Sequence, residues 1–169
     1  VDPHRISNAD LAEAALRQGI IVPESLTLED RDAWLDMILT ECVQPNLGVD
    51  QPTILYDYPT SQAALARTRI EGDIELAERF ELFVDGIELA NGYHELLDPE
   101  VLRVRNQTAN LLRGIDGKER LPESSYLLDA MDAGLPACAG VALGFDRLVM
   151  VALGASSIRD VLAFPFDRA

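Results

Sequence analysis

The stretch Gly140-Val-Ala-Leu-Gly-Phe-Asp-Arg147 predicts a β-strand over residues 141–143 that passes into a helix over residues 145–153. Glycine at positions 140 and 144 lets a ligand approach the backbone closely. Arg147 supplies a planar cation that can stack on a base and bind phosphate oxygens. A glycine-spaced turn is weak evidence by itself, so its meaning depends on the residues that precede it.

Two segments upstream predict an antiparallel hairpin. Glu78-Arg-Phe-Glu-Leu-Phe83 and Gly86-Ile-Glu-Leu-Ala-Asn-Gly-Tyr-His-Glu-Leu96 alternate around Asp85-Gly86, a strong signal for a tight turn. The strands are expected over residues 80–84 and 87–93. The spacing lets several carboxylates line one side of this hairpin.

Strict alternation decides which hairpin side chains share a face. It puts Asn91 on one face of the second strand, with Glu95 if the strand stays regular, and Glu88 on the other. His94 falls opposite to Asn91 and is expected to be structural. Glu81 lies on one face of the first strand, and the register across the turn decides which acids meet.

Carboxylates on a packed face need partners, which a magnesium-bound triphosphate or a substrate ammonium would supply. The alternative is a half-exposed sheet whose acids face water. Together with the glycines and the arginine of residues 140–147, the acids indicate a nucleotide-dependent ligase that activates a cationic amino acid.

The remaining pattern completes one α+β unit with antiparallel strands. A buried strand is expected over Thr53–Asp57. Thr27 with Asp30 resembles a capping box that opens the second helix, and its apolar stripe is expected to be core. That stripe consists of Trp34, Leu35, Ile38 and Leu39. Helices are predicted over residues 8–17, 28–43, 99–113 and 124–133, with a last turn or strand over 158–164.

Composition fits one globular domain of 169 residues, with 48% hydrophobic and 25% charged residues. The formal charge of −15 disfavours broad binding to nucleic-acid backbones. No apolar stretch approaches the roughly 20 residues of a membrane span, and the first residues do not resemble a signal peptide, so we expect a cytoplasmic location and no membrane contact. Cys42 and Cys138 lack zinc-ligand spacing and are expected to be buried.

Residues 140–147 resemble motif 3 of the class II aminoacyl-tRNA synthetases, and both hairpin segments resemble the lysine-specific branch. Within that branch, Ala90-Asn-Gly-Tyr-His-Glu95, Ala142 and Phe166-Asp-Arg-Ala169 are most similar to paralogues that modify elongation factor P. The resemblance covers residues 51–169 and, more loosely, 1–50. It implies an antiparallel sheet flanked by helices, in which 1–50 form a helical insertion and 51–169 carry the hairpin and motif 3. Motifs 1 and 2 are absent from this stretch, which is therefore expected to be the C-terminal part of the catalytic domain.

The resemblance implies a site for ATP and Mg²⁺. Glu81 and Glu88 would hold the metal, and Glu88 would also lie near the substrate amine. The backbone of Leu82 would contact adenine. Gly144 and Arg147 would contact ATP, and Arg147 and Glu81 would be the catalytic residues.

The same resemblance implies a site for the amino acid. Asn91, Tyr93 and Glu95 match lysine-recognition residues, and Glu95 would face the side-chain ammonium. Ala142 would lie close to the substrate. The tRNA-dependent lysine enzymes usually carry glycine at this position, so Ala142 distinguishes the two groups.

The implied function is ATP-dependent activation of lysine or (R)-β-lysine as an aminoacyl-adenylate. The acyl group would pass to a lysine of elongation factor P without tRNA, in a full-length enzyme expected to be a homodimer. A fragment of a lysyl-tRNA synthetase is the nearest alternative. A non-catalytic domain that binds a nucleotide or a partner is the alternative from another class.

Overall fold

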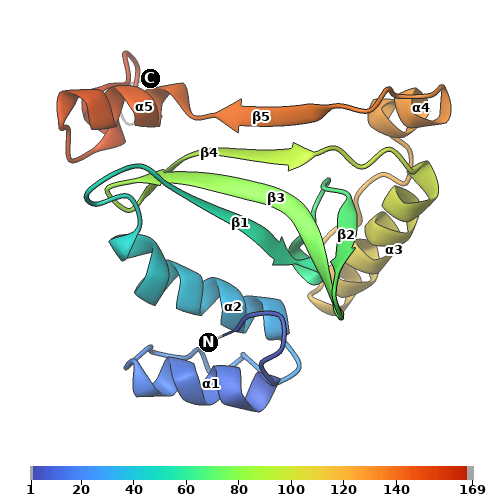
Figure 1. The fold of residues 1–169 in the computed structure, drawn as a ribbon, viewed down its shortest axis with the longest axis horizontal. Helices are drawn as coiled ribbons and strands as arrows, with labels where there is room; N and C mark the ends of the chain where they lie inside the picture. Colours follow the sequence, from blue (N-terminus) through green and yellow to red (C-terminus); the bar gives the residue numbers. More distant parts are fainter. Residues whose placement is uncertain (1, 167–169) are drawn as a thin grey trace.

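The computed structural model describes residues 2 to 166 and shows an open, five-stranded antiparallel sheet flanked by helices (Figure 1). The predicted α+β class is confirmed. The strands are β1 (Thr53–Pro59), β2 (Thr68–Glu71), β3 (Ile74–Val84), β4 (Ile87–His94) and β5 (Ala139–Leu143). The α-helices are α1 (Asn8–Arg17), α2 (Arg31–Ile38), α3 (Pro99–Ile115), α4 (Tyr126–Asp132) and α5 (Phe145–Leu153). Short helical turns are η1 (Leu39–Val43), η2 (Gln44–Asn46), η3 (Thr60–Gln62) and η4 (Ile158–Asp160).

The strand order is β1-β3-β4-β5, and β2 also pairs with β3. The predicted hairpin is confirmed as β3 and β4. Asp85 and Gly86 both have positive φ, 49° and 72°, as the two central residues of a type I′ turn require. β3 begins at Ile74 rather than at Phe80, and its first part pairs with β2, which alternation around one turn did not predict.

The two N-terminal helices pack on each other through Leu11, Ala15 and Trp34. α1 has the predicted bounds, and the hydroxyl of Ser7 caps it. α2 begins at Arg31, so the predicted capping box is wrong. The Asp30 carboxylate accepts hydrogen bonds from the backbone N–H and the hydroxyl of Thr27, which holds residues 27–30 as a turn before the helix.

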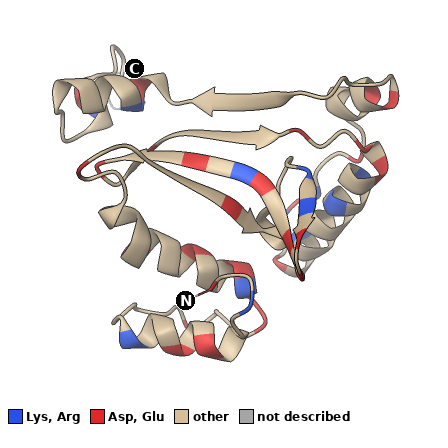
Figure 2. Ribbon diagram, viewed as in Figure 1, with Lys and Arg blue, Asp and Glu red and all other residues tan. Residues whose placement is uncertain are grey.

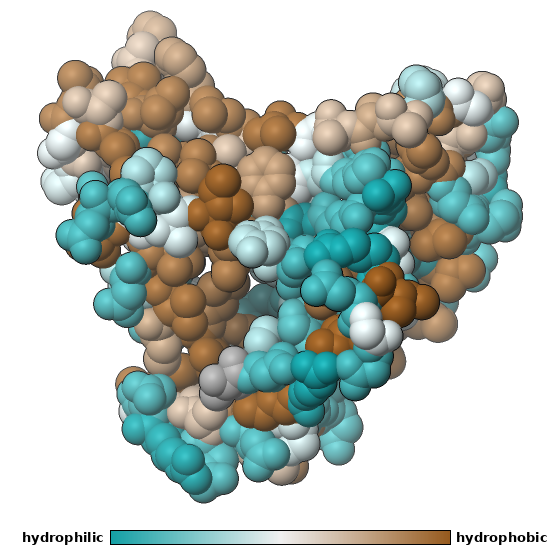
Figure 3. All heavy atoms as spheres, in the orientation of Figure 1, coloured by the Kyte–Doolittle hydropathy of each residue, from teal (hydrophilic) through white to brown (hydrophobic). Residues whose placement is uncertain are grey.

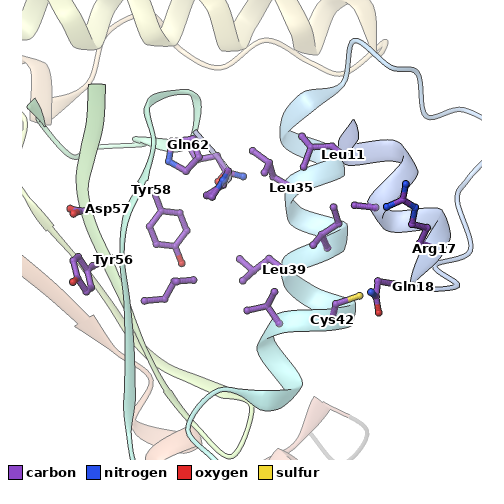
Figure 4. A pocket seen from close by; sticks show the side chains of 16 residues that line it. Leu11, Arg17, Gln18, Leu35, Leu39, Cys42, Tyr56, Asp57, Tyr58 and Gln62 are labelled. Carbon is purple, nitrogen blue, oxygen red and sulfur yellow. The ribbon is translucent and has the colours of Figure 1, made fainter. Parts of the chain in front are cut away.

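β1 is an edge strand, and the expectation that it is buried is wrong. Ile54 is 56% exposed and Tyr56 is 66% exposed, because their face of the sheet is open. The other side of β1 faces α1 and α2 across a groove of about 680 Å³ (Figure 4). Leu35, Leu39 and Cys42 line this groove, so part of the predicted core stripe borders open space.

Both cysteines are half-buried, not buried as expected. Cys42 borders the groove beside β1, and Cys138 borders a smaller cavity near α4. Each lies where two elements meet without closing over it. Apolar neighbours in the sequence therefore did not determine their burial.

The C-terminal half follows the predicted order of elements. Asp98 caps α3 by accepting from the backbone N–H of Glu100, at 2.9 Å. β5 leads directly into α5, and α4 and α5 lie at opposite ends of β5 (Figure 1). Residues 167–169, which contributed to the family resemblance, lie outside the described residues. No helix between residues 2 and 166 is both long and apolar enough to cross a membrane.

Candidate functional site

The strand register brings predicted site residues into one row across the sheet. Glu81 pairs with Asn91, and Asn91 pairs with Ala142, with Leu55 of β1 continuing the row. Paired residues in an antiparallel sheet project from the same face. We call the face that carries Glu81, Glu88, Asn91, Tyr93 and Ala142 the ligand face.

Glu88 lies on this face, so the strict alternation that placed it opposite to Asn91 is wrong. Leu82 pairs with Ala90 but Phe83 pairs with Glu88, which leaves Leu89 as an extra residue in β4. Such a β-bulge reverses the alternation beyond it. The Asn91 amide consequently donates to the Glu88 carboxylate at 3.4 Å.

Glu81 is a buried carboxylate, only 7% exposed, and it is paired with an arginine. Arg79 donates to Glu81 Oε1 at 2.5 Å. Figure 2 shows basic and acidic residues side by side along the middle of β3. Tyr58 lies beside this pair, and burial, with the neighbouring Glu81 carboxylate, raises the pKa of its phenol well above the usual range. The charge of Glu81 is therefore compensated inside the fold.

Arg147 reaches the same face from the first turn of α5. Its Nη1 donates to the backbone oxygen of Glu88 at 2.9 Å and lies 3.5 Å from the Glu88 carboxylate. Glu88, and not the adjacent Asp146, orients the guanidinium. Gly144 immediately precedes the helix as its N-cap residue, and its backbone N–H donates to the backbone oxygen of Leu89 at the bulge. The bulge therefore positions the predicted ATP-binding glycine as well as Glu88.

Glu95 approaches the neighbouring strand at Gly140. A Cβ atom added to Gly140 would lie 2.3 Å from Glu95 Oε1, so the carboxylate occupies the space that glycine leaves empty. Both residues line a cavity of about 350 Å³, whose other walls include Leu65, Leu127 and Met131. An acidic group within apolar walls suits an alkyl ammonium.

Two predicted residues point away from the ligand face. Leu82 pairs with Ala90 on the opposite face, so only its backbone is available for the predicted contact with adenine. His94 also lies there, with Nδ1 3.0 Å from the Glu78 carboxylate, which pairs with Arg67. The structural role expected of His94 agrees with this contact.

The donor set fits a magnesium ion that is shared with a polyphosphate. Mg²⁺ is usually held by one or two carboxylates together with substrate phosphates, rather than by a complete protein cage. Glu81 and Glu88 provide two carboxylates on one face, and Asn91 lies between them. Within residues 2–166 there is no cluster of three or more His, Cys, Asp or Glu side chains placed to hold a metal alone.

Sequence reasoning missed Arg79 and Tyr58. Arg79 stands two residues before Glu81, and this spacing alone puts both side chains on one face. Tyr58 could not be found in the same way, because Asp57 adopts a left-handed backbone, φ 61°, and the pairing of β1 with β3 shifts there. A local backbone irregularity thus adds an aromatic ring to the site.

Comparison with known proteins places this geometry in a family. Residues 36–168 match the family model described as tRNA synthetases class II (D, K and N). A protein of Salmonella dublin named elongation factor P–(R)-β-lysine ligase is 47% identical over all 169 residues, and its counterpart in Salmonella arizonae is 46% identical. The chain spans about half the length of these curated relatives, 51% in each case.

Proposed function

The chain belongs to the class II tRNA synthetase family, and we propose that the protein containing it activates lysine or (R)-β-lysine with ATP as an aminoacyl-adenylate. The aminoacyl group then passes to a lysine amine of elongation factor P, and AMP leaves. One observation carries the proposal. The residues Glu81, Asn91 and Ala142 form one cross-strand row, and Glu88 and Arg147 join it on the same face. This arrangement supports the proposal that they serve together as metal ligands, phosphate-binding cation and substrate contacts. The printed names of the Salmonella relatives support the substrate and the acceptor.

In this proposal the amino-acid carboxylate attacks the α-phosphorus of ATP, and pyrophosphate leaves. Glu81 and Glu88 would hold Mg²⁺, which would neutralise phosphate charge. Arg147 stacks on adenine and binds the terminal phosphate, so its contact with Glu88 gives way to ATP. Charge stabilisation of this kind is usually the largest contribution to catalysis.

Amino-acid recognition is assigned to the other end of the ligand face. Glu95 binds the side-chain ammonium, with Asn91 and Tyr93 beside it, and Glu88 lies near the second amine. The cavity beside Glu95 supports this assignment, because apolar walls suit the methylene chain of lysine. The Ala142 methyl group lies next to Asn91 and therefore near the substrate backbone.

The acceptor and the cellular setting are proposed on the resemblance. Transfer to elongation factor P without tRNA agrees with the names of the relatives, and a homodimer and a cytoplasmic location remain predictions. The alternatives, a lysyl-tRNA synthetase and a non-catalytic binding domain, make different predictions in one assay.

That assay is ATP–pyrophosphate exchange by the full-length protein, followed by transfer of radiolabelled amino acid. We expect exchange that depends on lysine or (R)-β-lysine, with label transferred to elongation factor P and not to tRNA. Transfer to tRNA would instead identify a lysyl-tRNA synthetase. A folded protein without amino-acid-dependent exchange would overturn the enzymatic proposal.

A further inference from the structure

The Arg79–Glu81 pair is enclosed to an unusual degree. Their side chains are 20% and 10% exposed, whereas the Arg67–Glu78 pair, which joins the residue before β2 to β3, leaves its arginine 48% exposed. A buried carboxylate needs a charged or hydrogen-bonding partner to stay ionised. Arg79 is that partner for Glu81, and it binds one carboxylate oxygen, Oε1.

Arg79 is itself held by two further groups. Its Nη1 donates to the backbone oxygen of Gln62 in η3 at 2.9 Å. Its guanidinium carbon lies 4.4 Å from the centre of the Tyr58 ring, close enough for a cation–π contact. A planar guanidinium can satisfy a carboxylate, a carbonyl and an aromatic face at once, which a lysine ammonium cannot.

A second arginine fixes the strand distortion that supplies Tyr58. Arg69 of β2 forms two hydrogen bonds of 2.7 Å with the carboxylate of Asp57, the left-handed residue where the register shifts. The two residues that flank Asp57 on β1 therefore point to opposite faces of the sheet. Tyr56 is exposed, whereas Tyr58 is buried beside Arg79. The distortion in the edge strand thereby supports the position of Arg79.

We propose that Arg79 is a positioning residue for Glu81. It fixes the carboxylate oxygen Oε1, and this orients the other carboxylate oxygen toward the metal and ATP. This inference rests on the proposed function, because it takes Glu81 as a metal ligand. Groups that orient metal ligands typically change metal affinity by about 10- to 100-fold when they are removed. Arg79 acts only through Glu81 and contacts no substrate.

The test is a double-mutant cycle in the full-length protein, with binding of Mn²⁺ as its readout. Electron paramagnetic resonance measures free Mn²⁺ in the presence of a non-hydrolysable ATP analogue. We expect Arg79→Met to weaken Mn²⁺ binding about tenfold in the wild-type background and to add no further loss in the Glu81→Gln background. Equal losses in both backgrounds would overturn the proposal, because Arg79 would then act independently of Glu81.

Two further variants keep the test decisive. Arg67→Met removes the ion pair that Arg67 makes with Glu78 of β3, on the opposite face, and it should leave Mn²⁺ affinity unchanged. If Arg79→Met does not fold, Arg79→Lys keeps the charge without the three-way contact and should still weaken binding several-fold. Wild-type Mn²⁺ affinity in Arg79→Lys would overturn the proposal in that case.

Failure of this inference differs from failure of the proposed function. A wild-type protein with amino-acid-dependent exchange, combined with Arg79 variants of unchanged Mn²⁺ affinity, would reject the positioning role alone. A wild-type protein without such exchange would reject the function, whatever the Arg79 variants do.

Discussion

The two faces of the sheet differ in how they treat one charged side chain and several aliphatic ones. On the ligand face Glu81 is 7% exposed and its charge is compensated by Arg79. On the opposite face Val141 is 62% exposed and Leu143 is 50% exposed, on β5 at the far edge of the sheet from β1. Apolar side chains also reach the surface between α5 and α2, at the left of Figure 3.

The difference shows on which face of the sheet a buried charge is paired. Buried charges cost free energy unless they are paired, and on the ligand face the buried charge of Glu81 is paired with Arg79. The opposite face carries exposed aliphatic groups and the more open Arg67–Glu78 pair, and we expect changes there to affect stability rather than chemistry. Four predictions test this division between the faces.

The largest effect is expected for Glu81→Gln in the full-length enzyme. An amide still accepts the hydrogen bond from Arg79, but it is a much poorer ligand for Mg²⁺. Lysine-dependent pyrophosphate exchange should fall on the order of a hundredfold or more. The measurement is exchange over a magnesium titration, with circular dichroism as the control for folding. Wild-type kinetics would show that Glu81 is not a metal ligand.

Much of the fold could be predicted because its signals are local. Asp85-Gly86 specified the hairpin, Asp98-Pro99 specified the start of α3, and a glycine preceded α5. β2 was missed because it forms a second hairpin with the first part of β3. The turn of this hairpin, at Gly72, lies before the strand predicted over residues 80–84. The capping box at Thr27 failed because the same side chains also form a turn.

The site was predicted less completely because it depends on two irregularities. The bulge at Leu89 moved Glu88 to the ligand face, and the left-handed Asp57 is accompanied by Tyr58 on that face. Neither has a signal in alternation, which assumes a regular strand. The family resemblance nevertheless predicted that Glu81 and Glu88 belong to one site. Alternation alone did not say whether these two acids share a face, because that depended on the register across the turn.

Ala142→Gly should change the choice of substrate. Ala142 lies opposite Asn91 on the ligand face, and its methyl group should distinguish an amine on the α-carbon from one on the β-carbon. One carbon in a binding pocket contributes about 1–3 kcal/mol to discrimination. We expect the ratio of kcat/KM for α-lysine to that for (R)-β-lysine to rise about tenfold. Val141→Thr, one residue away on the opposite face, is the control and should leave the ratio unchanged.

An unchanged ratio in Ala142→Gly would mean that residue 142 does not contact the substrate backbone. A changed ratio in Val141→Thr would contradict the division between the faces, because Val141 projects away from the ligand face.

Gly140→Ala should weaken amino-acid binding without unfolding the protein. The new methyl group would meet only the end of the flexible Glu95 side chain, at 2.3 Å, so the carboxylate can move aside. Displacing a charged hydrogen-bond partner should raise the KM for lysine by about tenfold. The KM for ATP and the melting temperature are the controls. An unchanged KM for lysine would remove Glu95 from the recognition of the ammonium.

The smallest effect is expected on the opposite face, for Arg67→Met. Arg67 holds the pKa of Glu78 below its ordinary value of 4.5, and His94 lowers it further. A carboxyl group with a lowered pKa in the folded state stabilises the protein above its ordinary pKa, and this contribution is lost as the pH falls through the lowered value. Arg67→Met should therefore be slightly less stable than wild type at pH 7, and the two should converge as the pH falls from 4.5 through the lowered pKa of Glu78. Urea denaturation of the full-length protein across this range measures the difference.

A difference in stability that does not depend on pH would mean that Arg67 stabilises the sheet by packing alone. A loss of exchange activity at neutral pH would show that the opposite face takes part in the chemistry.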